Sequence, residues 1–367
     1  MNKRIFKEQT SESGDIPFYK IGTFGATADA FISRELFETY KKKYPYPKIG
    51  DLLISASGSI GRVVEYKGND EYFQDSNIVW LKHDDRINNL FLKQFYSIVK
   101  WHGLEGSTIK RLYNKNILET TIHLPVFDEQ EKIGTLFKQL DDIITLHQRK
   151  LEQLKELKKA YLQLMFPKKD ETVPRVRFAD FEDDWQLCKL GDVVEIFDGT
   201  HQTPRYTDSG VKFVSVENIA TLETKKYITH EAYEKEYSKK RAKKGDILMT
   251  RIGDIGTMKV IETDEPLAYY VTLALLKAKE TNPYFLSFII SSPEIQRNIW
   301  KRTLHIAFPK KINLGEINQV EMKITIFEEQ DKIGDLFTNL DDAIILNQNK
   351  LNQLKSLKKS YLQNMFI

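Results

Sequence analysis

Cysteine is nearly absent from this chain of 367 residues, in which Cys188 is the single example. One cysteine excludes an intrachain disulfide and a metal cluster built on several thiolates, and it is typical of a protein of the reducing cytoplasm. No apolar run approaches the length of a membrane span, and residues 1–15 lack the apolar core of a signal peptide. The sequence therefore predicts a cytoplasmic protein that does not enter a membrane.

The motifs of common catalytic sites are lacking as well. The phosphate-binding pattern GxxxxGK[ST] does not occur, and the seven histidines are scattered without an HExxH or other ligand spacing. The glycine pairs at 58–61 and 253–256 are too short for a phosphate loop and indicate tight turns. We therefore predict a chain that is not itself an enzyme and that holds neither a metal nor a cofactor.

What the chain does contain is a long repeat. Residues 127–166 and 327–366 align without a gap and are identical at 27 of 40 positions. Apolar residues recur in both copies at alternating spacings of four and three, which is the pattern of a coiled-coil helix. Because one chain carries two such seams, we expect the helices to bury them against each other.

The seam positions are those we assign to contact between the helices and with partner proteins. They are Ile133, Phe137, Leu140, Ile144, Leu151 and Leu154 in the first copy, and Ile333, Phe337, Leu340, Ile344, Leu351 and Leu354 in the second. Polar residues interrupt both copies at 147 and 158 and at 347 and 358. Such residues can fix the register of a coiled coil, but a lysine with its head in water and a solvated histidine are the interpretation we favour.

Each helix follows a globular segment. We divide the chain into a first domain (residues 1–126), a first helix (127–167), a linker with the second domain (168–326) and a second helix (327–367). Gly50-Asp51 before LLIS and Gly245-Asp246 before ILMT predict turns that enter buried strands. The predicted fold class is α+β: two mixed α/β domains, each with one or two helices beside a mostly antiparallel sheet, separated by the two long helices packed as a coiled coil.

The first domain lacks a counterpart to one part of the second. Aligning Gly14 with Gly210 leaves nothing opposite the segment from Val173 to about Ile196, which contains the strand-like LGDVVEIF. Two explanations remain open: Met1 is not the natural start of the chain, or the first domain takes this strand from elsewhere.

The sequence is similar to those of a known protein family. The order of domain, helix, domain and helix resembles the specificity subunits of type I restriction–modification systems, and so do the helix openings FDEQEKIGTLFKQLDD and FEEQDKIGDLFTNLDD. The stretches VPRVRFADFEDDWQLCKLGD, DGTHQTPRYTDSG and GSTIKRLYNKNILETTIHLP also resemble this family. The resemblance implies two target-recognition domains, each reading half of a split site in double-stranded DNA.

The same resemblance implies the partners. The two helices would form an antiparallel coiled-coil spacer that docks two methyltransferase subunits, and motor/nuclease (restriction) subunits would join this core. S-adenosylmethionine is expected on the methyltransferase partner and not on this chain. The alternatives are a coiled-coil scaffold whose domains bind proteins without DNA specificity and, with less support, a self-contained modifying enzyme.

The net charge is only +3, so a DNA-binding surface must come from local clusters of basic and polar residues. For phosphate contacts we select Lys110, Arg111, Lys240, Arg241, Lys243, Lys244, Lys310 and Lys311. For contacts with bases we select Ser57, Ser59, Ser107, Thr108, Thr200, His201, Gln202, Thr203, Arg205, Arg251 and Asp254. The alternative for the basic runs is a solvated surface.

Arg251 is the strongest single candidate, because a guanidinium can bind guanine through two hydrogen bonds. The alternative, a structural ion pair within the domain, has equal weight on the sequence alone.

Overall fold

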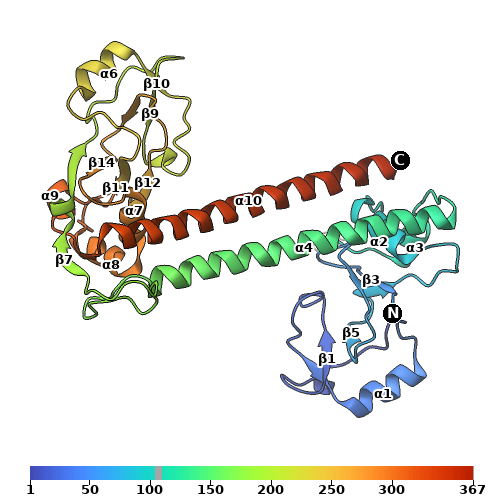
Figure 1. Ribbon diagram of the computed structural model, residues 1–367. Helices are drawn as coiled ribbons and strands as arrows, with labels where there is room; N and C mark the ends of the chain where they lie inside the picture. The colour runs from blue at the N-terminus through green and yellow to red at the C-terminus, as the bar shows by residue number, and fades with distance from the viewer. Residues whose placement is uncertain (104–109, 367) are drawn as a thin grey trace. The chain divides into compact units, whose positions relative to one another are not determined.

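The computed structural model describes residues 1–103 and 110–366, and the chain folds as two compact units. One unit contains residues 1–148 with 349–367, and the other contains residues 149–348. Each unit consists of one globular domain and one half of each long helix, and each is described by itself below (Figure 1).

The second domain is built around a four-stranded antiparallel sheet of order β12-β11-β14-β8. A three-stranded sheet, β10-β9-β13, and a pair, β15-β7, complete the strands. The strands are β7 (Gln186–Lys189), β8 (Val194–Asp198), β9 (Val211–Val214), β10 (Tyr227–Ile228), β11 (Ile247–Ile252), β12 (Asp254–Val260), β13 (Leu267–Tyr269), β14 (Leu273–Ala278) and β15 (Glu321–Ile324). The helices are α5 (Leu190–Val193), η2 (Val216–Asn218), α6 (His230–Tyr237), α7 (Pro283–Ser291), α8 (Pro293–Arg302) and α9 (Leu314–Asn318).

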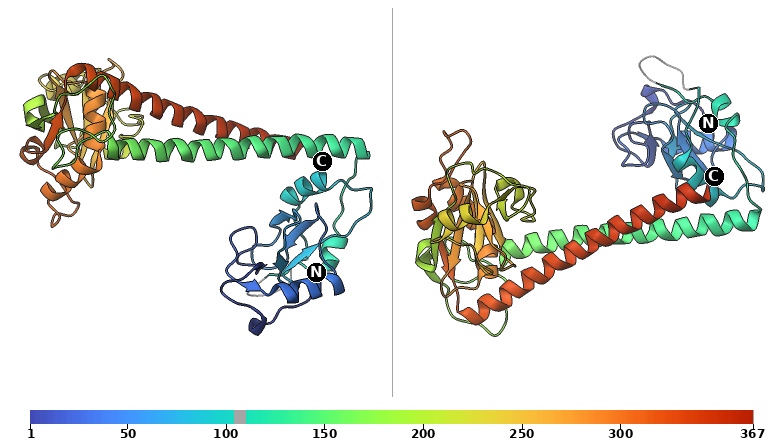
Figure 2. Two further views of the ribbon diagram at one scale, coloured as in Figure 1. Left: turned by 60° about the horizontal axis from the view of Figure 1, so that its bottom comes forward. Right: turned by 90° about the horizontal axis from the view of Figure 1, so that it is seen from above.

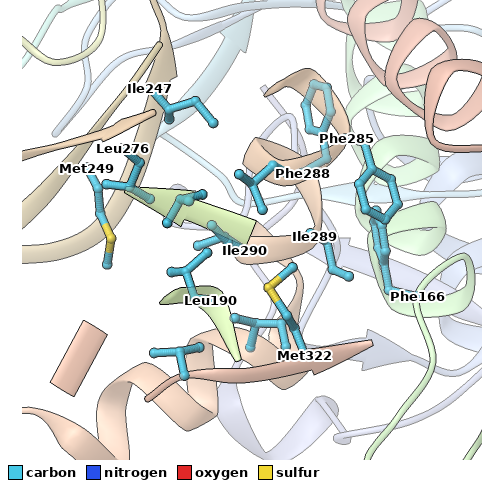
Figure 3. Close-up of a cluster of buried hydrophobic side chains, with 14 of the residues drawn as sticks. Phe166, Leu190, Ile247, Met249, Leu276, Phe285, Phe288, Ile289, Ile290 and Met322 are labelled. Carbon is cyan, nitrogen blue, oxygen red and sulfur yellow. The ribbon is translucent and has the colours of Figure 1, made fainter. Parts of the chain in front are cut away.

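One apolar core joins this sheet to the helices (Figure 3). Ile247 and Met249 of β11 point into it, as the predicted buried strand requires, and α7 contributes Phe285 and Ile289. Phe166, just after the first long helix, lies in the same core. The end of that helix is therefore fixed to the second domain by burial of apolar surface.

The first domain has two three-stranded sheets, β2-β1-β5 and β4-β3-β6. Its strands are β1 (Ile16–Tyr19), β2 (Phe31–Ile32), β3 (Leu52–Ser55), β4 (Val63–Glu65), β5 (Tyr72–Phe73) and β6 (Ile78–Trp80), and its helices are η1 (Lys7–Gln9), α1 (Arg34–Lys43), α2 (Asn89–Ile98) and α3 (Asn114–Leu118). Both domains contain more helices than predicted. The sequence analysis did not single out α1 and α6, and α3, α5 and α9 have only four or five residues, too few to show helical periodicity.

The long helices are α4 (Phe127–Leu164) and α10 (Phe327–Met365), and they pack antiparallel in each unit (Figures 1 and 2). In the first unit Phe137 and Leu140 of α4 meet Leu354 and Tyr361 of α10. In the second unit Leu154 and Tyr161 of α4 pack against a core that contains Ile333, Phe337 and Leu340 of α10. The predicted fold, two mixed α/β domains with an antiparallel pair of long helices, is confirmed.

The start of each long helix is docked on its own domain in the same way. The Gln130 side chain is buried, accepts a hydrogen bond from the Asn88 N–H and donates to the Pro125 carbonyl. Gln330 repeats both bonds with Asn282 and Thr325. Four residues further on, a Cβ at Gly134 would lie 2.6 Å from the Leu90 Cβ, so only glycine allows this approach of α4 to α2. These contacts explain the repeated glutamine of the EQxKIG opening and the glycine of its first copy.

The lysines that interrupt the seam are not simply solvated. The half-buried Lys158 ammonium lies 2.5 Å from the Asp341 carboxylate in one unit, and Lys358 lies 2.6 Å from Asp141 in the other. The favoured interpretation of a lysine head in water is therefore wrong, because each head reaches an aspartate on the opposite helix. Asn347 is buried and His147 is half-buried. These polar contacts fix the helix register.

No helix among residues 1–103 and 110–366 combines the length and the apolar content needed to cross a membrane.

The single cysteine gives a first testable prediction. Cys188 lies on β7 opposite Met322, and burial raises the pKa of its thiol to about 11. At pH 8 its thiolate population, and therefore its alkylation rate, is expected to be on the order of a hundredfold lower than for an unperturbed thiol. Labelling with iodoacetamide should be slow in the native chain, fast in urea, and accelerate as the pH rises toward 11. Equal native and unfolded rates at pH 8 would contradict this environment.

Candidate nucleic-acid interface

One buried arginine holds together three loops of the second domain. They are the loop after β8, the turn between β11 and β12, and loop 303–311. Arg251 lies near the end of β11 and is 6% exposed. Its Nη1 donates to Asp198 Oδ1, at 2.5 Å, and to the Val271 carbonyl, and its Nε donates to the Ile312 carbonyl at 3.2 Å. These bonds connect the ends of β8 and β11 with the segment that follows loop 303–311. Arg251 thus forms the structural ion pair that the sequence left open, and its donors are turned to the protein rather than to a base.

Backbone hydrogen bonds fix the third loop to the turn between β11 and β12. The Gly253 N–H donates to the Lys310 carbonyl, and the Ile312 N–H donates to the Arg251 carbonyl. Gly253 has a φ of +85°, a left-handed conformation that glycine adopts without strain. Lys310 and Lys311 are exposed on this loop, and the Lys310 ammonium lies 4.5 Å from the Trp300 ring centroid. Positive charge therefore lies beside the turn.

The loop after β8 presents several of the predicted residues. His201 is exposed and its Nε2 lies 2.7 Å from Asp198 Oδ2, so the same carboxylate contacts His201 and Arg251. Gln202, Thr203 and Arg205 are exposed on this loop, and so is Asp254 in the turn. Thr200 is 7% exposed. Its N–H donates to the Tyr269 carbonyl of β13 and its carbonyl accepts from the Val271 N–H, so it positions the loop. The structure brings this loop together with Asp254, Lys310 and Lys311.

The basic run at 239–244 lies elsewhere. It precedes β11, whereas the three loops meet where β11 ends, and at about 3.3 Å per residue Ile247 and Arg251 are roughly 13 Å apart. Lys240 pairs with Glu236, and Arg241 pairs with Glu234. Lys243 and Lys244 are exposed. This run is separate from the loop surface, and neighbouring carboxylates compensate part of its positive charge.

The first domain carries a different surface at the matching place. Ala56 is the counterpart of Arg251 in the first domain. Its N–H donates to the Asn77 carbonyl, just as the Arg251 N–H donates to the Thr272 carbonyl. Ser57 is buried and donates to Asn77 Oδ1, whereas Ser59, Lys110 and Arg111 are exposed. Ser107 and Thr108 lie outside the described residues.

The structure adds two residues that the sequence did not single out. Ile306 and Phe308 are fully exposed near the tip of loop 303–311, close in sequence to Lys310 and Lys311. Apolar side chains that project from a basic loop are typical of surfaces that contact bases or enter a groove. A signal was present in the HIAFPKK stretch, but isolated apolar residues cannot be separated from core residues by sequence alone.

Duplicated halves with unlike loop surfaces define a two-domain recognition protein. The chain belongs to the family described as the type I restriction modification DNA specificity domain, whose model matches residues 1–156 and 182–356. This membership confirms the predicted family and supports DNA specificity over a protein-binding scaffold. Members of the family provide specificity and are not the catalytic subunits.

Named proteins agree with this assignment. A Haemophilus influenzae protein named as a type I restriction enzyme specificity subunit is 54% identical over 144 residues, which cover 39% of this chain and 37% of that protein. The MjaVIII specificity subunit of Methanocaldococcus jannaschii is 23% identical over 78% of this chain and 72% of its own length. The crystal structure of the type I S subunit from Mycoplasma genitalium has the same fold, with a TM-score of 0.65, 15% identity and coverage of 100% of this chain and 92% of that one.

Proposed function

We propose that this chain gives a type I restriction–modification assembly its DNA sequence specificity. Each globular domain reads one half of a bipartite site in double-stranded DNA, and α4 and α10 set the gap between the halves. The helices also dock two methyltransferase subunits, which hold S-adenosylmethionine, and motor/nuclease subunits join them. The assembly acts in the cytoplasm.

The observation that carries this proposal is the contrast between the two kinds of repeated part. The helices are identical at 27 of 40 aligned positions, whereas the domains differ at the place where their loops meet, with Arg251 in one and Ala56 in the other. Helices that share most of their sequence suit a partner that binds twice. Unlike loops suit two different base sequences, because base-specific contacts depend on the individual side chains.

The loop surface of the second domain has suitable chemistry for DNA. Lys310, Lys311 and Arg205 provide positive charge for phosphates, and Gln202 and Thr203 provide hydrogen-bonding groups for base edges. Phe308 and Ile306 add apolar contact area. Arg251 links the loops beneath their exposed side chains, so we assign it a positioning role rather than a direct contact with DNA.

A domain exchange tests the assignment of one domain to one half-site. Replacing residues 173–320 with the matching segment of another specificity subunit is expected to change only one half of the methylated site, because the first domain is unaltered. The measurement is sequencing of methylated adenines after reaction with the methyltransferase subunits and S-adenosylmethionine.

Replacement of residues 1–126 is the reciprocal control and should change only the other half. A change of both halves by either exchange would contradict the proposal. Affinity of the assembled complex for duplex DNA should fall steeply with added salt, whereas a scaffold that binds only proteins would show no affinity for DNA.

A further inference from the structure

The tip of loop 303–311 is apolar and fully open to solvent. Ile306 is 99% exposed and Phe308 is 104% exposed, and Trp300, at the end of α8 just before the loop, is 54% exposed. Single apolar side chains are common on protein surfaces, but a group of large ones within nine residues indicates a surface that becomes covered on binding. The hydrogen-bonding surface described above gives this tip no specific role.

Hydrogen bonds fix the base of the loop from which the tip projects. The Leu304 N–H donates to the Lys311 carbonyl at 2.8 Å, which closes the loop. The Gly253 N–H donates to the Lys310 carbonyl at 2.8 Å, which ties the base to the turn between β11 and β12. A tip on a base that is already fixed loses less conformational entropy on binding than a free loop would. The tip is therefore presented together with the polar loops of the second domain.

Positive charge lies beside the tip. Lys310 and Lys311 are exposed, and the Lys310 ammonium lies 4.5 Å from the centroid of the Trp300 ring. Charge of this sign complements the phosphates that flank every base step of DNA. An apolar tip beside two lysines therefore suits a nucleic acid better than it suits an uncharged protein surface.

The chemistry of Phe308 limits how it can contact a base. Its ring has no hydrogen-bonding group, so it cannot read the donors and acceptors of a base edge, but it can stack on the face of a base. In an intact duplex the neighbouring base pairs cover those faces, so a base step must open before the ring can reach one. Phenylalanine and isoleucine side chains can act as wedges that enter a step and partly unstack it.

The two halves of the chain differ at this position. Arg111 and Lys311 form equivalent β-bridges, each with the chain at or just after the end of the central strand of its domain, β3 or β11. Counting back from this matched pair places Thr108 opposite Phe308 in the sequence, and Thr108 itself lies outside the described residues. Because threonine is small and polar, it cannot replace an aromatic wedge. The difference restricts a wedge to the second domain.

We propose that Phe308 enters one base step of the half-site read by the second domain and partly unstacks it. Ile306 lies beside it, and Lys310 and Lys311 contact the flanking phosphates. The first domain makes no such insertion. This inference rests on the proposed function and adds that part of the specificity comes from the deformability of one step. Pyrimidine–purine steps open most readily, so the second domain should prefer one there without a hydrogen bond to its bases.

Duplexes that carry 2-aminopurine, a fluorescent base that brightens when it loses its stacking neighbours, test the wedge in the complex with the methyltransferase subunits. The label occupies one position at a time in both half-sites, apart from the adenines that become methylated. We expect brightening at one step of the half-site read by the second domain and none in the other. Phe308→Thr, which introduces the residue of the first domain, should abolish it.

Three control variants separate the wedge from the charge. Lys310→Ala should weaken binding and reduce its salt dependence, because a phosphate contact is lost, whereas the saturated complex should still brighten. Phe308→Leu keeps a large apolar side chain and should keep most of the brightening. Leu187→Ala removes an exposed apolar side chain of β7, which precedes the start of β8 rather than its loop end, and should change neither quantity.

Replacement of the opened step measures its contribution to specificity. Exchange of a pyrimidine–purine step for a purine–purine step should weaken binding of the native complex by about tenfold, because the stiffer step resists unstacking. The same exchange should affect the Phe308→Thr complex much less. Equal losses in the two complexes would show that the step is not read through its deformability and would overturn that part of the inference.

The remaining outcomes distinguish the wedge from the proposed function. Site-specific methylation without brightening, equal brightening by the Phe308→Thr complex, or brightening in both half-sites would overturn the wedge alone. Loss of assembly with the methyltransferase subunits in Phe308→Thr would identify a protein as the occupant of the tip and would also overturn it. Absence of site-specific methylation by the native complex would overturn the proposed function and the wedge with it.

Discussion

Insertion of seven residues after Arg149 and seven after Asn349 is expected to lengthen the gap between the two half-sites by about three base pairs. Seven helical residues add about 10 Å, and the duplex rises 3.4 Å per base pair. These points lie midway between the two interhelical ion pairs, Lys158–Asp341 and Lys358–Asp141, so the inserted segments face each other and both pairs are kept. Methylated-site sequencing measures the new gap.

Affinity of the lengthened protein should fall even though the gap grows. Three base pairs turn the duplex by about 100°, whereas a heptad turns a straight helix face by only about 20°. Insertion into one helix alone is the control, because it breaks the antiparallel register and should abolish site-specific methylation. An unchanged gap with both insertions would show that α4 and α10 do not set the spacing.

Arg251→Met is expected to destabilise the second domain by about 2–3 kcal/mol, because it leaves the partly buried Asp198 carboxylate without its main partner. The three loops should loosen together, since the same guanidinium bonds to the carbonyls of Val271 and Ile312. Denaturant unfolding measures the loss, and hydrogen exchange at β8 and β11 locates it.

Arg241→Met provides the matched control. Arg241 pairs with Glu234 on the surface, where both side chains are about half exposed, and loss of such a pair costs under about 1 kcal/mol. Asp198→Asn combined with Arg251→Met should recover part of the stability, because the uncompensated charge is then removed. Equal destabilisation by Arg251→Met and Arg241→Met would refute the positioning role of Arg251.

Short-range patterns in the sequence determined the long helices and the repeat. The apolar seam from Ile133 to Met165 has helical spacing, and helix formation depends on side chains three and four residues apart, which sequence shows directly. The absence of a counterpart to residues 173–196 was also readable, because a repeat within one chain supplies its own reference.

Only the tertiary structure decided how distant residues meet. Arg251 and Asp198 are far apart in sequence, so the choice between a base contact and an ion pair required the fold, which places β8 and β11 on either side of β14. The same holds for Lys158 with Asp341, and for the exposure of Ile306, Phe308 and Met365. Periodicity is a property of neighbours along the chain, whereas ion pairing and exposure depend on which surfaces cover a residue in space.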